Sequence, residues 1–174
     1  MVMTAPGPDT LEREKDKLLE RLDALFDYNP ETGLFIRKHA SGGAKAGSVA
    51  GHVNKDGYRY IRIDGKRYLA HRLAWLCVYG EWPPSDLDHE DGNGDHNWIK
   101  NLRPATDSQN MANQRKHKDN IGYKGAYRTG TRWIAKIKKD GVVRRLGRFD
   151  TPEEAHAAYC AAAKELFGEF ARAE

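Results

Sequence analysis

The chain has 174 residues, of which 31% are charged and 39% hydrophobic, and its formal net charge is +4. This length allows one large or two small domains. No run of about 18 apolar residues is present to span a membrane, and the amino terminus lacks the basic and apolar regions of a secretory signal. The two cysteines, Cys77 and Cys160, stand far apart, which favours free thiols in a reducing cytoplasm over a zinc knuckle.

Positive charge is concentrated in two blocks. Residues 36–72 carry nine basic and two acidic residues, and residues 111–148 carry twelve basic and two acidic residues. Segregated basic residues interleaved with Tyr and Trp are typical of proteins that bind polyanions. The two blocks bracket the polar segment 86–115, so we predict that this segment acts on a nucleic acid.

In chain order, the first half of the chain predicts helices and short strands. Apolar residues at helical spacing predict an amphipathic helix over 10–27, followed by a turn at 29–33 and a strand at 34–37. After a Gly-rich loop at 39–51, two β-type runs at 58–63 and 66–69 flank Asp64-Gly65, a strong hairpin signal. Residues 69–79 have helical periodicity, and Gly80 can end that helix.

The second half predicts a strand, a polar loop, a second strand and a helix within 86–115, then a basic linker at 115–122. Residues 132–138 alternate, with Trp133, Ala135 and Ile137 on one face and Ile134 among the basic residues on the other. Asp140-Gly141 predicts a hairpin turn, and Thr151 begins an Ala-rich helix over 152–167. This helix should pack on one face of a three-stranded sheet and leave the basic face open.

Three polar residues within 86–115 suit phosphodiester hydrolysis, which needs a base, a cation and positioning. His89 can serve as a general base near neutral pH. Asp88 and Asn110 can hold one divalent ion, Mg²⁺ or Mn²⁺, with the substrate phosphate completing the coordination. A capping box from Thr106 to Gln109 would place Asn110 in the first turn of a helix.

The segment also resembles a known motif. Asp88-His89, Asp91-Gly92-Asn93, Asn97, Ile99 to Arg103, Thr106 and Ser108 to Asn110 look like the HNH (ββα-metal) endonuclease motif in the form found in phage homing endonucleases. The resemblance implies that His89 is the general base, that Asn101 orients it by holding the loop backbone, and that Asp88 and Asn110 bind metal. Asn97 is an alternative for the middle role, and an asparagine at the third position favours a hard ion over zinc.

We interpret His71 as a core residue that forms a hydrogen bond, because it lies in an apolar helix, and His96 as a surface loop residue.

The carboxy-terminal residues resemble a second family. Segments 123–127, 132–138, 146–151 and 153–159 look like the Apetala-two/ethylene-response-factor (ERF) DNA-binding domain, whose three-stranded sheet enters the major groove. The matching positions imply DNA contacts at Lys124, Arg132, Lys136, Lys138 and Arg145. Arg145 stands where the family has a DNA-facing Trp, so we expect sequence-tolerant binding.

Together these patterns predict an α+β protein with a tail and helix at 1–22, an HNH nuclease domain at 23–118 and an ERF-like domain at 119–174. Its predicted activity is metal-dependent nicking of double-stranded DNA, as a monomer or weak dimer, in the cytoplasm of a bacterial host. The alternative is a non-catalytic DNA-binding protein with a degenerate HNH site. Further predicted DNA contacts in the first domain are Arg59, Arg62, Arg67, Arg103, Arg115 and Lys116.

Overall fold

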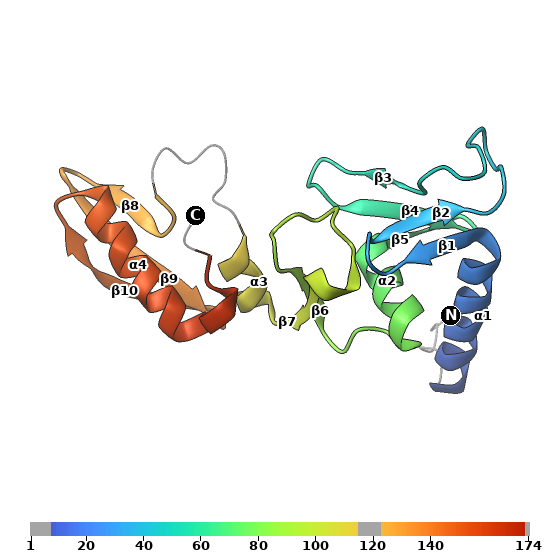
Figure 1. Ribbon diagram of the computed structural model, residues 1–174. Helices are drawn as coiled ribbons and strands as arrows, with labels where there is room; N and C mark the ends of the chain where they lie inside the picture. The colour runs from blue at the N-terminus through green and yellow to red at the C-terminus, as the bar shows by residue number, and fades with distance from the viewer. Residues whose placement is uncertain (1–7, 115–122, 173–174) are drawn as a thin grey trace, which may run out of the picture. The chain divides into compact units, whose positions relative to one another are not determined.

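The computed structural model describes residues 8–114 and 123–172 (Figure 1). Its contacts divide the chain after Arg103 into two compact units. The first unit contains α1 (Pro8–Leu25), β1 (Phe26–Asn29), β2 (Leu34–Arg37), β3 (His52–Val53), β4 (Arg59–Ile63), β5 (Lys66–Leu69), α2 (Ala70–Tyr79), β6 (Asp86–His89), the 3-10 turn η1 (Ile99–Asn101) and the start of β7 (Leu102–Ala105). The second contains α3 (Asp107–Asn113), β8 (Ala126–Thr129), β9 (Arg132–Lys139), β10 (Val142–Phe149), α4 (Pro152–Phe167) and η2 (Gly168–Phe170). The predicted α+β class is confirmed.

In the first unit, small antiparallel sheets pack with two helices around one core. β1 pairs with β2, β4 pairs with both β3 and β5, and β6 pairs with β7. The turn between β4 and β5 is the predicted hairpin, since Asp64 and Gly65 both adopt positive φ angles, 46° and 82°. The largest apolar side chains that are fully buried are Phe35, Ile61, Leu73 and Leu76, and they hold the elements that carry the polar segment.

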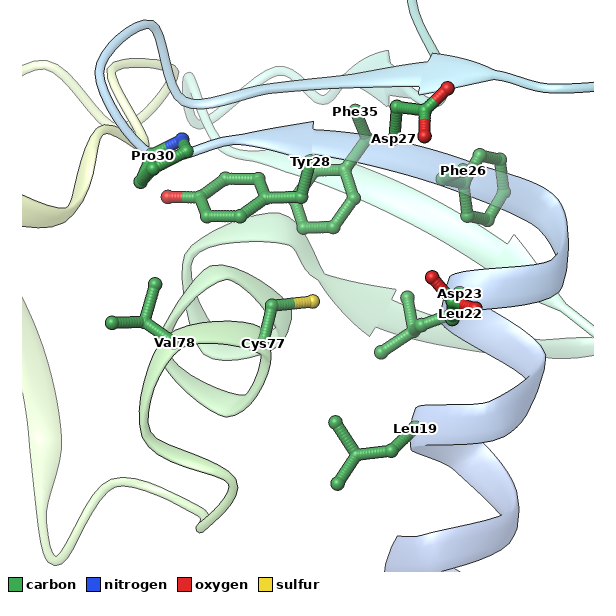
Figure 2. A pocket seen from close by; sticks show the side chains of 10 residues that line it. All are labelled: Leu19, Leu22, Asp23, Phe26, Asp27, Tyr28, Pro30, Phe35, Cys77 and Val78. Atoms are coloured by element: carbon green, nitrogen blue, oxygen red, sulfur yellow. The ribbon is translucent and has the colours of Figure 1, made fainter.

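The predicted helix over 10–27 was wrong at its carboxyl end. α1 ends at Leu25, and Phe26 begins strand β1. The rings of Phe26 and Tyr28 lie 6.3 and 4.6 Å from the ring of Phe35 on β2, measured between centroids. These contacts across the hairpin bury aromatic area and override the helical spacing in the sequence. β1 and β2 also line a cavity of about 380 Å³ together with α1 and α2 (Figure 2).

The second unit is a three-stranded antiparallel sheet in the order β10-β9-β8, with α4 packed on one face. α4 begins with the predicted capping box, in which Thr151 Oγ1 accepts from the backbone N–H of Glu154. Ala155 and Ala163 are buried where α4 meets the sheet, so the small residues permit the predicted close packing. Ile134 was predicted to face outward with the basic residues, yet only 9% of its surface is exposed, because long neighbouring side chains such as Tyr127 flank it across the sheet.

Helix α3 contributes to the core of the second unit. Ala105 and Ala112 pack in one cluster with Tyr159, Phe167 and Phe170. The boundary between the two units therefore lies before α3, whereas the predicted domain boundary at 118/119 lies after it, and that domain boundary stays a prediction. The predicted linker 115–122 lies outside the described residues. In the described part of the chain, no helix is both long and apolar enough to cross a bilayer.

Candidate active site

Strand β6 carries two adjacent, buried, ionisable residues. Asp88 is 6% exposed and His89 is 5% exposed. Asp88 Oδ2 accepts a hydrogen bond from Arg103 Nε at 2.9 Å, and the two side chains form an ion pair with little solvent access. Removing one partner from a buried ion pair is strongly destabilising, so Arg103 is important for the buried position of Asp88. Arg103 was predicted to contact DNA; the structure places its guanidinium on Asp88, and a DNA contact stays a prediction.

Asn101 closes the polar loop, residues 90–98, which follows β6. Its Oδ1 accepts from the backbone N–H of Asp91 at 3.1 Å, and its Nδ2 donates to the carbonyl of His96 at 2.8 Å. Its backbone carbonyl also accepts from Glu90 N at 2.9 Å. Asn101 therefore binds both ends of the polar loop, the arrangement expected of the middle asparagine, while its effect on catalysis stays a prediction.

The other candidate for the middle role, Asn97, contacts the imidazole itself. His89 Nε2 lies 3.1 Å from Asn97 Oδ1, and Asn97 is 1% exposed. Burial lowers the pKa of His89, and the hydrogen bond to Asn97 opposes part of that shift. The imidazole is therefore neutral at pH 7, which is the state a general base requires. The sequence offered no periodicity that distinguishes the asparagine at the ring from the one at the loop.

His71 packs against the same imidazole. The ring centroids of His71 and His89 lie 5.0 Å apart with the planes nearly perpendicular. His71 is 6% exposed, and burial lowers its pKa to about 3. The interpretation of His71 as a core residue is confirmed, but its Nδ1 has no hydrogen-bond partner within the described residues. The predicted hydrogen bond is therefore wrong for this atom.

Three arginines on β4 and β5 were predicted to contact DNA, and they differ in their exposure to solvent. Arg59 donates to the Asp95 carboxylate from Nε at 2.6 Å and from Nη2 at 2.9 Å, and its side chain is only 16% exposed. It anchors the polar loop to β4 through this ion pair, and a DNA contact by Arg59 stays a prediction. Arg62 and Arg67 are exposed and lie opposite each other across β4 and β5, where they are available to a phosphate backbone.

His96 lies on the outer side of the polar loop. Its side chain is 45% exposed, and its Nδ1 lies 2.5 Å from Asp91 Oδ2. Its ring also contacts the ring of Trp98, with 4.7 Å between the centroids and 34° between the planes. The interpretation of His96 as a surface loop residue is confirmed.

The proposed metal ligands lie in separate units, Asp88 in the first and Asn110 in the second. Asn110 sits in the first turns of α3, where Thr106 forms the predicted capping box with Gln109. Over residues 8–114 and 123–172, no three or more His, Cys, Asp or Glu side chains form a group that could hold a metal ion. This finding does not test the predicted ligands, because they are only one carboxylate and one amide. Metal binding by Asp88 and Asn110 therefore stays a prediction.

The basic face of the second unit consists of the exposed residues Arg132, Lys136, Lys138 and Arg145, on the side of the sheet away from α4. Arg132 Nη2 also pairs with Asp150 at 2.9 Å, and Lys136 Nζ lies 5.6 Å from the ring centroid of Tyr127. The face combines cationic and aromatic groups, as nucleic-acid-binding surfaces do.

Lys124 does not belong to this basic face. Its Nζ donates to the carbonyls of Ala112, Gln114 and Arg172, so it ties α3 to the carboxyl end of the second unit. Burial lowers the pKa of Lys124 to about 8, whereas three carbonyl acceptors favour the ammonium form, which alone has three N–H bonds to donate. A DNA contact by Lys124 stays a prediction. The predicted contacts Arg115 and Lys116 lie outside the described residues.

Comparison with known proteins supports the nuclease interpretation. Residues 68–112 match the HNH endonuclease family. That segment contains β6, the polar loop, β7 and most of α3, and so includes Asp88, His89, Asn101 and Asn110. The chain is also similar to a protein of Acanthamoeba polyphaga mimivirus described as an uncharacterized HNH endonuclease, with 33% identity over 122 residues. The similar region covers 69% of this chain and 64% of the viral protein, so the chain spans less than two thirds of that relative.

Proposed function

We propose that this chain is a metal-dependent DNA endonuclease of the HNH type. The observation that carries the proposal is the geometry of the matched segment. Asn101 closes the loop after β6, and the buried pair Asp88 and His89 lies at the start of that loop. A decayed binding module would have no need to keep a buried carboxylate and a buried imidazole side by side, because each costs free energy to remove from water.

In the proposed reaction, neutral His89 accepts a proton from a water molecule whose oxygen attacks phosphorus in line. The bond from phosphorus to the 3′ oxygen breaks, and the resulting ends are a 5′-phosphate and a 3′-hydroxyl. Arg103 holds the Asp88 carboxylate in its buried position through their ion pair. A divalent ion, Mg²⁺ or Mn²⁺, would be held by Asp88 and Asn110, whose oxygen donors suit hard cations, and it would supply positive charge for the leaving oxygen.

The proposed substrate is double-stranded DNA. Arg62 and Arg67 on the first unit and the basic face of the second unit offer exposed cations for phosphate contacts, and such contacts are independent of sequence. One site per chain favours nicking by a monomer or weak dimer. The resemblance to phage homing enzymes and the similarity to a viral protein support action in the cytoplasm of a host cell.

Plasmid relaxation tests the proposed activity. Supercoiled DNA incubated with the protein and Mg²⁺ should be nicked, and EDTA should stop the reaction. His89→Ala should lower the rate by about 10²- to 10⁴-fold, the usual contribution of a general base, while the matched variant His52→Ala, at an exposed histidine outside the polar segment, should cleave at the wild-type rate. Equal cleavage by His89→Ala would remove His89 as the base. Tight binding of DNA by a wild-type protein that never cleaves it would favour the non-catalytic alternative.

The salt dependence of DNA binding tests the basic face. Replacing Lys136, Lys138 and Arg145 together with Gln should flatten the plot of log K against log salt concentration by about 0.9 for each phosphate that the variant no longer neutralises. The matched control replaces Lys17, an exposed lysine of α1. An unchanged slope in the triple variant would contradict the proposed role of this face.

A further inference from the structure

Asn97 is a buried polar residue whose side-chain amide and backbone carbonyl all have partners near the site. Its Nδ2 donates to the carbonyl of Asp95 at 2.9 Å. Its backbone carbonyl accepts from the hydroxyl of Tyr28 at 2.9 Å. Its Oδ1 lies 3.1 Å from Nε2 of His89. With 1% of its surface exposed, Asn97 has no access to water as an alternative partner, so these contacts determine how its amide is oriented.

The orientation of this amide determines where the imidazole proton lies. A backbone carbonyl can only accept hydrogen bonds, so the amide NH₂ of Asn97 must face Asp95. Its Oδ1 must then face His89, and an amide oxygen can also only accept. A short contact between two acceptors would be repulsive, so Nε2 of His89 must carry the hydrogen.

We propose that Asn97 is a positioning residue that holds the proton of His89 on Nε2, which makes Nδ1 the nitrogen that takes up the proton from the attacking water. In this step, Nδ1 gains one proton from water, and the water oxygen forms a bond to phosphorus. The bond between phosphorus and the 3′ oxygen breaks, and its electron pair leaves with that oxygen. That oxygen takes a proton from solvent, and the imidazolium later returns its own. The catalytic part of this inference rests on the proposed nuclease function, whereas the tautomer does not.

The hairpin of β1 and β2 holds Asn97 in place. Besides the bond from Tyr28, the carbonyl of Pro30 accepts from Ile99 N at 3.0 Å. Gly33 lies so close to the loop that a Cβ atom there would stand 2.3 Å from the carbonyl carbon of Asn97. The Tyr28 ring lines the cavity shown in Figure 2, beside Phe35, and is packed independently of its hydroxyl. The amino-terminal hairpin therefore acts through Asn97 on the imidazole.

The two asparagines thus divide the work of positioning. Asn101 binds the backbone at the two ends of the loop, and Asn97 binds the ring. Loss of the Asn101 side chain would loosen the loop. Loss of the Asn97 side chain would leave the loop closed, but the proton of His89 could then lie on either ring nitrogen. A wrong histidine tautomer can greatly lower turnover without preventing substrate binding.

The experiment is ¹⁵N NMR of the imidazole of His89 in the full chain without metal, near neutral pH, combined with nicking kinetics. The wild type should show hydrogen on Nε2 and an unprotonated Nδ1. Asn97→Leu, which keeps the size of the side chain but has no acceptor, should show a mixture of tautomers, and its kcat should fall by about 10²-fold with little change in KM. Tyr28→Phe should cause a smaller shift in the same direction, and Tyr68→Phe, another half-buried tyrosine of the same core, should cause none.

Each outcome decides between the alternatives. Hydrogen on Nδ1 in the wild type would overturn the proposal even if Asn97→Leu failed to fold. An unchanged tautomer and unchanged kcat in a folded Asn97→Leu protein would also overturn it. The two readouts also separate the tautomer from the nuclease function. If NMR shows the expected tautomer in the wild type and its loss in Asn97→Leu, the assignment of the proton stands. If the same wild-type protein does not cleave DNA, the nuclease function fails.

Discussion

Gly33 offers the sharpest test of how the amino-terminal hairpin supports the polar loop. Its φ angle is +72°, and a Cβ atom at this position would lie 2.2 Å from the backbone nitrogen of Trp98 and 2.3 Å from the carbonyl carbon of Asn97. These are backbone atoms, so no side chain can rotate away to make room. Gly33→Ala must displace either the turn between β1 and β2 or the loop that carries Asn97.

The size of the effect follows from two separate costs. The left-handed backbone conformation disfavours any residue with a Cβ atom by about 1 kcal/mol. The steric overlap adds about 1–3 kcal/mol, the usual cost of inserting a methyl group where there is no space. Gly80 provides the matched control, because its φ angle of +71° is nearly the same and a Cβ atom there would have no other atom within 4 Å. We therefore expect Gly80→Ala to cost about 1 kcal/mol and Gly33→Ala about 2–4 kcal/mol.

Urea denaturation of both variants measures the two free energies of unfolding, and plasmid nicking measures the activity of the folded fraction. Displacement of Asn97 by about 1 Å would misplace His89, and misplacements of this size can cost about 10²-fold in rate. Gly33→Ala should therefore lose activity beyond its loss of stability, and Gly80→Ala should not. Equal free energies of unfolding for the two variants would refute the close approach of the hairpin, and wild-type nicking by Gly33→Ala would refute its connection to the site.

Three further predictions concern other buried or partly buried ionisable side chains. Lys124→Met should destabilise the chain by about 1–3 kcal/mol in urea melts, because it leaves carbonyls at the end of α3 without their donor, whereas Lys138→Met on the basic face should not; equal losses would contradict this. Arg59→Lys should lose about 1 kcal/mol or more and lower nicking, because a lysine cannot form the paired bonds to the loop carboxylate, and Arg67→Lys is its exposed control. Since burial lowers the pKa of His71 from 6.5 to about 3, the unfolded chain binds more protons between these values, and stability should fall as the pH drops from 6.5, by up to about 1.4 kcal/mol per pH unit. His71→Leu should flatten this dependence in acid denaturation curves, and an unchanged curve would show that His71 is not the group responsible.

Local signals in the sequence predicted the parts of the fold that depend on neighbouring residues. Asp64-Gly65 and Asp140-Gly141 both form tight turns with positive φ angles, because such turns require two adjacent residues that tolerate that backbone conformation. The capping boxes at Thr106 and Thr151 also begin α3 and α4 as predicted, since each involves hydrogen bonds across three residues.

Contacts between distant residues were beyond the reach of such signals. The helical spacing of apolar residues in the sequence continues past Leu25. In the fold, however, Phe26 begins strand β1 and its ring packs against the ring of Phe35. The sequence predicts that Lys124 and Arg59 are exposed cations within basic blocks. In the fold, Lys124 donates to backbone carbonyls and Arg59 donates to a loop carboxylate. A charge count cannot distinguish a cation available to phosphate from one already paired within the protein.

The sequence by itself therefore determined the turns, the helix starts and the presence of Asp88, His89, Asn101 and Asn110 in a motif that matches the HNH endonuclease family. Only the tertiary structure decided which asparagine contacts the imidazole and which closes the loop. Both are asparagines in one short segment. Their contacts differ because the hairpin of β1 and β2 packs against the backbone of Asn97, whose side chain contacts His89. That difference depends on a contact between residues 69 positions apart, which no spacing within the motif encodes.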